Sequence, residues 1–213
     1  MNSVGVEEFK TGNYRIGREL EILNHFDLSD LDDSSIEHII YTLKHKKALI
    51  MTYVELTGLL PSYDSRLYWH DTEKLFMYMT MNDCKKSSNL HISTSVHHYG
   101  NLETDDDRLE AVLDYECARF TKHDKPLNAY ETILKYKPDA EEILGDILDK
   151  YGIHSKERLD YKFNLYYEYQ NELEDLFIEN TLYILNLCFE YSERHNINDL
   201  LSWYNNLVRE TKI

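Results

Sequence analysis

Histidine and carboxylate side chains recur in the first half of the chain in an order that could form a metal site. His45 comes first, His70 and Asp71 follow side by side, and Asp114 comes last. Imidazole nitrogens and carboxylate oxygens form a mixed ligand set, which suits Mn, Fe, Co, Ni, Mg or Zn better than thiophilic ions. A His-Asp pair arises easily by chance in a chain with 10 histidines, so order and spacing carry this prediction.

The segments that hold these residues have the pattern of helices. Apolar residues at helical spacing, with capping candidates before them and Gly58 after them, predict a helix over about 35–57 that carries His45. A second helix is predicted over about 66–81, and it would carry the His-Asp pair. Each ligand would then project from a rigid rod.

The rest of the chain is also predicted to be helical. Residues 84–107 lack helical periodicity and indicate a long loop with at most one short helix. A helix follows around Asp114, and two short helices broken at Pro138 come next. The Tyr- and Leu-rich stretch 155–193 and the last segment 197–210 complete the pattern.

The sequence therefore predicts an all-α protein in three regions. Residues 1–33 form a lead-in, 34–153 a metal-binding helical core, and 154–213 a C-terminal helical extension packed on that core. Only 7 Gly and 3 Pro punctuate the 213 residues, which favours long helices over many short strands. His123 and Asp124 are expected to form a turn before the following helix.

Composition excludes several classes of protein. The net charge of −16 argues against binding duplex nucleic acid, because phosphate contacts need a surface of Lys and Arg. No apolar run is long enough to span a membrane, and the N-terminus has no signal-peptide pattern. The three cysteines are scattered and form no Cys-x-x-Cys pair, so we expect neither disulfides nor a thiolate zinc site, and a cytoplasmic location.

The ordered ligands resemble the signature of a known superfamily. His…His-Asp…Asp, with a lysine at position 74 after the pair, is similar to the motif of the HD-domain superfamily of metal-dependent phosphohydrolases. The resemblance covers about residues 34–125, and the stretch "VLDYECARFTKHDKPLNAYET" resembles uncharacterised HD-like proteins of bacteria and phages. It implies an HD-domain-like helical bundle and a first divalent metal ion held by four side chains: His45, His70, Asp71 and Asp114.

The resemblance also implies roles for nearby residues. Asp71 would bridge to a second ion if one is present, so the site would hold one or two ions. Several HD branches add two more histidines in the interval that here contains His97 and His98. Because adjacent side chains point in different directions, we expect His97 to bind metal and His98 to contact substrate. His91 is a third candidate, and the choice among the three is left open.

The implied reaction is hydrolysis of a nucleotide or a similar small phosphate ester by metal-activated water. Asp71 would orient the water, and Lys74 would neutralise a phosphate oxygen. Further basic side chains are expected to contact the phosphate: Arg66, Arg119 and Lys122. Stacking of a base on Trp69 or Tyr115 is a further hypothesis.

Other functions stay open at this stage. Some members of the same superfamily are di-iron oxygenases, and the supply of extra histidines would suit such a centre. Alternatively, the chain is an acidic helical interaction protein in which the site is vestigial, as the charge and the long C-terminal region suggest. Lys74 has the competing interpretation of a solvated helix charge. Whether the chain forms a homodimer is also left open.

Overall fold

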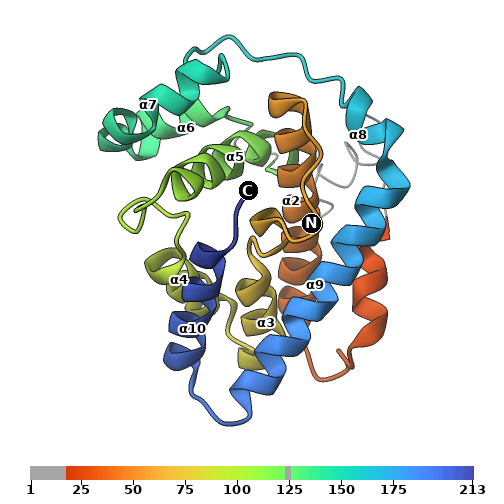
Figure 1. Cartoon of the computed structure of the whole chain (residues 1–213). Helices are drawn as coiled ribbons and strands as arrows, with labels where there is room; N and C mark the ends of the chain where they lie inside the picture. Colours follow the sequence, from red (N-terminus) through yellow and green to blue (C-terminus); the bar gives the residue numbers. More distant parts are fainter. Residues whose placement is uncertain (1–17, 123–125) are drawn as a thin grey trace.

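The computed structural model describes residues 18–122 and 126–213, and every regular element among them is a helix (Figure 1). The all-α prediction is confirmed. His123 and Asp124 lie outside the described residues. In chain order the elements are η1 (Arg18–His25), α2 (Asp33–Thr57), η2 (Arg66–Tyr68), α3 (Thr72–Met81), α4 (Cys84–Thr94), α5 (Asp105–Thr121), α6 (Ala129–Tyr136), η3 (Pro138–Ala140), α7 (Glu141–Lys150), α8 (Asn164–Glu168), α9 (Gln170–Ser192) and α10 (Ile197–Glu210).

Helix α2 is the central rod of the fold, and α3, α5 and η1 all pack against it (Figure 1). Its ends follow the capping signals of the sequence. The Asp32 side chain accepts a hydrogen bond from the backbone N–H of Ser35, and Gly58 closes the helix in the left-handed conformation at φ 67°. Every residue from Thr42 to Val54 is buried, so the middle of this helix is surrounded by protein. His45 lies in that buried stretch.

The helix predicted over 66–81 is interrupted where the His-Asp pair stands. A short 3-10 turn, Arg66–Tyr68, ends at Trp69, and α3 begins only at Thr72. Asp71 precedes α3 with a left-handed backbone, φ 56°, and its side chain makes no capping hydrogen bond. The apolar pattern runs through the break, which is why sequence periodicity predicted one helix. Because Asp71 does not cap α3, its carboxylate is available to neighbouring side chains.

The segment predicted as a loop contains the one short helix that was expected. Asp83 caps α4 by accepting a hydrogen bond from the backbone N–H of Lys86. The chain then turns back through residues 95–104, and α5 begins with a capping box between Thr104 and Asp107. This return carries the two adjacent histidines towards α3 and α5.

The C-terminal region differs from the prediction of continuous helix over 155–193. Residues 155–163 are not helical, and α8 and α9 begin only afterwards. The cause is a competing set of backbone bonds, because the Glu55 carboxylate accepts from the N–H groups of Lys162, at 2.9 Å, and Phe163, at 2.8 Å. Phe163 is fully buried there, so the segment is fixed by packing as well.

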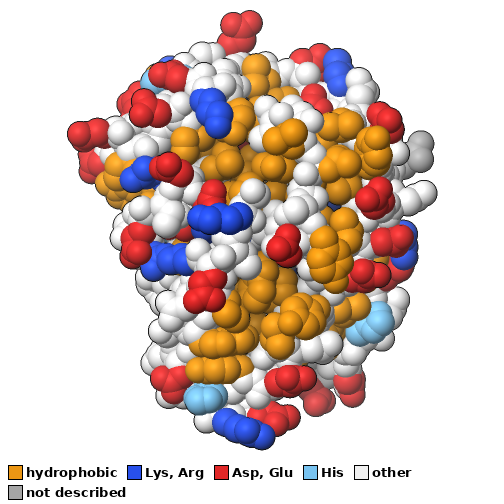
Figure 2. Space-filling model, viewed as in Figure 1, with side chains coloured by type: hydrophobic (Ala, Val, Ile, Leu, Met, Phe, Trp, Pro, Cys, Tyr) orange, Lys and Arg blue, Asp and Glu red, His pale blue; other side chains and the backbone are white. Residues whose placement is uncertain are grey.

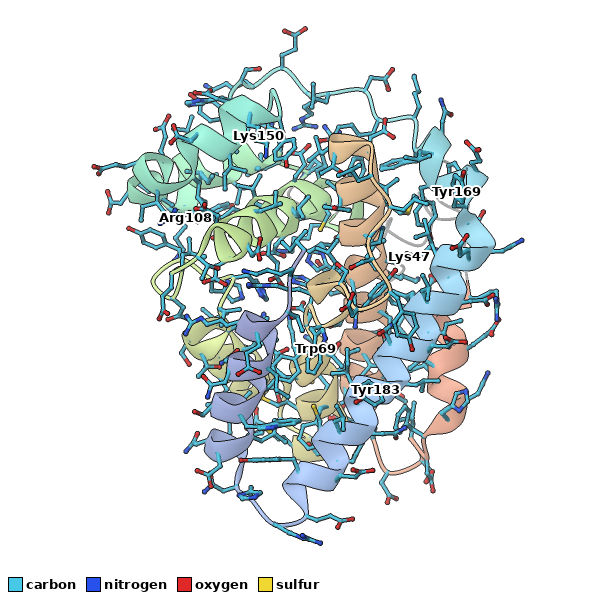
Figure 3. All side chains as sticks on the ribbon, viewed as in Figure 1. Lys47, Trp69, Arg108, Lys150, Tyr169 and Tyr183 are labelled. Carbon is cyan, nitrogen blue, oxygen red and sulfur yellow. The ribbon has the colours of Figure 1, made fainter. Side chains whose placement is uncertain are left out.

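One large hydrophobic core joins all three predicted regions of the chain, with residues from Ile22 to Val208. A smaller second core lies among α5, α6 and α7. Lys47, labelled in Figure 3, lies between α2 and α9, where its Nζ pairs with Glu19 at 3.1 Å and Glu174 at 2.6 Å. Among residues 18–122 and 126–213, no helix is both long and apolar enough to cross a lipid bilayer.

Candidate metal centre

The four residues of the sequence motif converge at the junction of α2, α3 and α5. His45 Nε2 lies 2.6 Å from Asp114 Oδ1, and His70 Nε2 lies 3.9 Å from that same oxygen. His70 Nε2 is also 3.7 Å from Asp71 Oδ1. Ligands that bind one ion at about 2.0–2.2 Å stand no more than roughly 4 Å apart. The spacing of these atoms therefore fits a shared ion.

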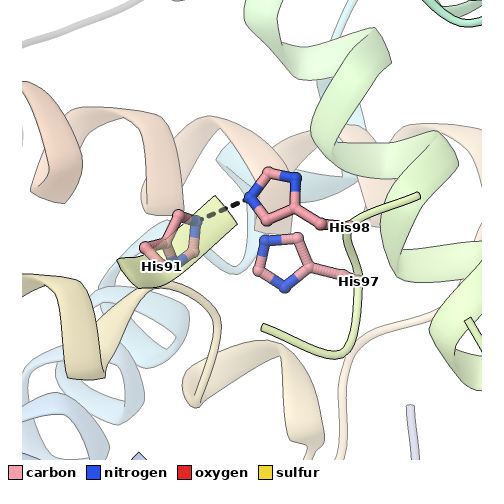
Figure 4. A group of neighbouring side chains, drawn as sticks. All are labelled: His91, His97 and His98. Atoms are coloured by element: carbon pink, nitrogen blue, oxygen red, sulfur yellow. Dashed lines mark hydrogen bonds between the residues drawn. The ribbon is translucent and has the colours of Figure 1, made fainter. Parts of the chain in front are cut away.

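A second group of imidazoles adjoins the first through Asp71. Its Oδ1 atom lies 3.1 Å from His91 Nε2 and 3.5 Å from His97 Nε2. His98 completes the group, since its Nε2 is 2.8 Å from His91 Nε2 (Figure 4). Each of the three histidines offers one ligating atom within 4.8 Å of the others. One carboxylate oxygen thus lies beside both groups.

The expectation that His97 and His98 point in different directions is wrong. Figure 4 shows both rings on the same side of their loop, facing His91, and their centroids are 4.7 Å apart. The turn between Ser95 and Asn101 makes this possible, because its backbone bonds fold the loop tightly around the pair. His98 therefore lies among the candidate ligands, and it also lines the neighbouring cavity.

The second ring nitrogen is held by another side chain in four of the five candidate histidines, His98 being the exception. The pairs are His45 Nδ1 with Thr121 Oγ1 at 3.2 Å, His70 Nδ1 with Glu110 Oε1 at 2.8 Å, His91 Nδ1 with Glu73 Oε1 at 2.6 Å, and His97 Nδ1 with Ser95 Oγ at 3.0 Å and Glu110 Oε1 at 3.3 Å. An imidazole that donates from Nδ1 to a carboxylate keeps the Nε2 lone pair for a metal ion, and metal sites in proteins commonly use this arrangement.

Three atoms at the centre of the site have no hydrogen-bond partner among the described residues. They are His70 Nε2, Asp71 Oδ1 and His97 Nε2, and all three are buried. Buried polar atoms are nearly always paired, since an unpaired one costs about 1–3 kcal/mol. A cation between these atoms would satisfy all of them at once. The residues present therefore fit a metal ion.

Glu110 is the residue that sequence reasoning missed. Its Oε1 atom serves two imidazoles, while Oε2 accepts from Arg66 Nε at 2.6 Å. It stands one helical turn before Asp114 on the inward side of α5, and it is 1% exposed. An acidic residue four positions before a predicted ligand on a buried helix face was the signal available in the sequence.

Arg66 was expected to contact the phosphate of the substrate, and it does not. Its guanidinium is buried and pairs with Glu110 and with Asp107, the latter at 2.6 Å from Nη2. Arg119 also differs from the prediction, because its Nη2 donates to the Leu159 carbonyl at 2.7 Å. Its planar group lies over the rings of neighbouring aromatic residues, away from the ligands. Both arginines therefore support the fold.

Lys74 and Lys122 were also predicted to contact the phosphate, and unlike the two arginines they lie beside the candidate ligands. Lys74 and Lys122 line a cavity of about 610 Å³ that opens beside the candidate ligands His45, Asp71 and Asp114. Lys74 Nζ lies 3.2 Å from Asp71 Oδ2, the oxygen that faces away from the two imidazole groups. Figure 3 shows Trp69 within the bundle, where it packs on Tyr204 in the core and does not line this cavity.

Tyr115 belongs to the second hydrophobic core and is also not a cavity residue. The aromatic side chains that line the cavity are Tyr41 and Tyr78. Base stacking on Trp69 or Tyr115 is therefore corrected in favour of these two. Both stand one helical turn from a polar cavity residue, Tyr41 before His45 and Tyr78 after Lys74.

The electrostatics of the site favour ionised carboxylates. Burial alone would raise the pKa of Asp71, but the positive charges of Lys74, His70 and His91 outweigh it and hold that pKa well below its usual value. Burial is likewise outweighed at Asp114, where the hydrogen bond from His45 keeps the pKa well below its usual value. Both side chains are therefore carboxylates at neutral pH, as metal ligands must be.

The histidines of the second group share protons unequally. Burial opposes the imidazolium form of His91, but Asp71 and Glu73 reverse the effect and raise its pKa to about 9. Burial and the neighbouring His97 and His91 lower the pKa of His98 to about 2. Without an ion, His91 is the donor and His98 the acceptor of the bond in Figure 4.

Cys117 lies close to the site and forms, with His45 and Asp114, a further group of side chains that could hold a metal ion. Its Sγ atom is 3.7 Å from both ring nitrogens of His45. Burial raises the pKa of this thiol well above its usual value, so the sulfur stays protonated. A thiol among the potential ligands was not expected from the sequence, which predicted nitrogen and oxygen atoms alone.

Comparison with protein-family models, with curated proteins and with solved structures finds no match to this chain. A function therefore has to be argued from the chemistry of the site. The plain finding is that buried groups of His, Asp and Glu side chains could hold a metal ion.

Proposed function

We propose that this protein is a metal-dependent phosphohydrolase of the HD type that acts on a nucleotide or a similar small phosphate ester. One observation carries the proposal: Asp71 Oδ1, buried and without a well-aligned hydrogen bond, lies beside both groups of imidazoles next to a cavity that contains lysines. Shared carboxylates between two adjacent ions are typical of sites that hydrolyse phosphate esters. The order of ligands along the chain, which resembles the HD signature, supports the same conclusion.

Two ions fit the ligand set. The first would be held by His45, His70, Asp71 and Asp114. The second would be held by the three histidines His91, His97 and His98, with Asp71 shared. Divalent ions in these positions would supply Lewis acidity, which lowers the pKa of a water molecule and offsets negative charge on a phosphoryl oxygen.

The reaction would join a water oxygen to phosphorus and break the bond between phosphorus and the ester oxygen. The departing oxygen takes up a proton, so the products are an alcohol and inorganic phosphate. Lys74 holds Asp71 Oδ2 at 3.2 Å, which fixes the carboxylate so that Oδ1 faces the imidazoles. The same ammonium lines the cavity and can pair with a phosphate oxygen. Lys122, on the cavity wall, adds a second positive charge.

Metal analysis of the purified protein tests the proposal. We expect the wild type to bind one or two equivalents of a divalent ion and the His70→Ala variant to lose most of it. The matched control is His25→Ala, because His25 is an exposed histidine outside the site. A panel of phosphate esters with added Mn, Co or Mg should give turnover with the wild type and with His25→Ala, and none with His70→Ala. A wild type that holds no ion and hydrolyses no ester would remove the proposal.

A second candidate is a di-iron oxygenase, and the nitrogen-rich second group favours it. Three histidines around one position, His91, His97 and His98, offer ligands that suit iron as well as zinc or manganese. Iron-loaded protein would then absorb visible light, give a paramagnetic signal after partial reduction, and consume dioxygen with a suitable organic substrate. Colourless iron-loaded protein without such a signal would exclude this candidate.

A further inference from the structure

The cavity beside the candidate metal centre changes character along its length. Its inner end holds candidate ligands, and its other end is formed by different side chains of α2, α3 and α4. On α2, His38 stands seven residues before His45, which is about 10 Å along the helix axis. On α3, Tyr78 stands one turn beyond Lys74, and on α4, Ser88 stands one turn before His91.

These three remote side chains meet one another. The Tyr78 hydroxyl is 2.8 Å from Ser88 Oγ, and the rings of Tyr78 and His38 have centroids 5.2 Å apart. Glu37, beside His38, and Ile92, one helical turn beyond Ser88, also line the cavity. We call these five residues, Glu37, His38, Tyr78, Ser88 and Ile92, the outer subsite.

The outer subsite combines aromatic and aliphatic side chains with hydrogen-bond acceptors. His38 Nδ1 donates to the Ser34 carbonyl at 2.7 Å, so the neutral ring presents Nε2 as an acceptor. The exposed Glu37 carboxylate is a second acceptor. Aromatic rings with nearby acceptors suit a flat ring that carries N–H donors.

We propose that the outer subsite binds the leaving group of the substrate, and that this leaving group carries a flat heterocycle with an amino substituent. The inference rests on the proposed function, because it places the scissile phosphate between the candidate ligands and the lysines. The separation of about 10 Å leaves room for a phosphate and a sugar-sized linker before the ring. The cavity volume of about 610 Å³ suits a ligand of this size.

Equilibrium binding to the metal-loaded full chain, with each probe supplied as its non-hydrolysable phosphonate analogue, is the first test. Three probes differ stepwise: adenosine 5′-monophosphate, purine riboside 5′-monophosphate, which lacks the amino group, and ribose 5-phosphate, which lacks the ring. We expect calorimetry to give affinities that fall in this order, by roughly tenfold at each step. Equal affinities for the three probes would overturn the proposal.

Variants assign the selectivity to the subsite. His38→Ala and Glu37→Gln alter a half-exposed and an exposed side chain, so both are expected to fold. Each should weaken binding of adenosine 5′-monophosphate by about tenfold and leave ribose 5-phosphate unchanged. His25→Ala and Glu179→Gln, exposed elsewhere, are the matched controls. A variant that weakens all three probes equally would contradict the assignment.

Turnover of the same three esters separates the two proposals. Selective binding without hydrolysis of any ester would remove the proposed function and leave the subsite standing. Hydrolysis of all three esters with equal kcat/KM would leave the proposed function standing and remove the subsite.

Discussion

At the scale of single residues, the site depends on side chains that hold the ligands as much as on the ligands themselves. Glu110 contacts His70 and His97 with one oxygen and Arg66 with the other. Burial would raise the pKa of Glu110, but the charges of Arg66 and His97 keep it well below its usual value. Glu110 is therefore a carboxylate that fixes the orientation of two imidazoles from different segments.

Substitution of this positioning residue gives the first prediction. Glu110→Gln removes the charge and one acceptor while it keeps the shape, so the side chain can accept from the two rings or from Arg66 but not from both. We expect metal affinity to fall about 10–100-fold while the helical circular dichroism is retained. Glu142→Gln, exposed on α7, is the control. A metal titration that gives the same affinity for Glu110→Gln and wild type would show that Glu110 is only a structural partner of Arg66.

At the scale of elements, helix ends decide where the ligands stand. The break between η2 and α3 gives Asp71 a left-handed backbone, which for a residue other than glycine costs about 1 kcal/mol or more. Such strain often occurs at functional sites, where the surrounding structure maintains it. The return loop after α4 then brings the adjacent histidines to the same carboxylate.

Alanine substitution of two glycines tests how much backbone conformation contributes to the stability of these helices. Gly58 ends α2 at φ 67°, whereas Gly145 lies inside α7, and an added Cβ would meet no atom within 4 Å at either position. Gly58→Ala should therefore destabilise by about 1 kcal/mol through backbone strain alone. Gly145→Ala should stabilise by about 0.5–1 kcal/mol, because alanine loses less entropy in a helix.

Urea unfolding of the two alanine variants measures both effects. Opposite signs are expected, with unchanged m-values. If Gly58→Ala proved neutral, the left-handed cap would contribute nothing to the end of α2. If Gly145→Ala proved destabilising, an interaction other than backbone conformational entropy would decide the stability of α7 at this position.

At the scale of the whole molecule, charged side chains occupy two places: many lie on the surface, and a few are buried as ion pairs. Figure 2 shows acidic side chains interspersed with Lys and Arg over one face, with hydrophobic groups between them. Inside, Arg66 and Lys47 each lie between two carboxylates and join elements that are distant in sequence. Arg66 also ties the C-terminus, because its backbone N–H donates to the Lys212 carbonyl at 2.8 Å.

Acid unfolding should reveal the buried pair of Arg66 and Asp107. Burial would raise the pKa of Asp107, but backbone N–H groups of Glu103 and Thr104 and the Arg66 charge lower it below 3.8. Its stabilising contribution is therefore complete above pH 3.8 and is lost as the pH falls through the lower folded value. Asp107→Asn should cost about 3 kcal/mol at pH 7 and reduce the acid dependence.

The free energy of unfolding, measured in urea between pH 7 and pH 2.5, checks this expectation. The wild type should lose stability more steeply than Asp107→Asn below about pH 4. Asp105→Asn is the control, since Asp105 is 91% exposed at the side chain and lies in the same helical turn. Parallel curves for the wild type and Asp107→Asn would show that other carboxylates govern acid unfolding.

Metal removal should change the stability of the whole chain. The candidate ligands come from α2, α4, α5 and the segments before α3 and α5, so an ion would join most of the fold. Saturation at 100 times the dissociation constant should add about 2.7 kcal/mol to the free energy of unfolding. Thermal scans with added Mn²⁺ and then with excess chelator measure the gain and its reversal. An unchanged Tm in both scans would contradict a site that binds metal in the native state.

The sequence by itself determined the helical class, the main helices and the types of ligand. Helical periodicity and capping residues are local, so α2, α5 and α10 could be predicted from neighbouring residues alone. The prediction that His45, His70, Asp71 and Asp114 would lie together rested on their order, their chemistry and the resemblance to the HD signature, and the structure places them close together.

Only the tertiary structure decided which groups hold these ligands and which face the cavity. Arg66 turns inward to Glu110, and His98 joins His91, because residues far apart in sequence supply their partners. The break before α3 and the non-helical stretch 155–163 arise in the same way, from packing and from side-chain acceptors that compete with helical bonds. The local sequence pattern cannot predict such contacts, because the partners are far apart in sequence and meet only in the folded protein.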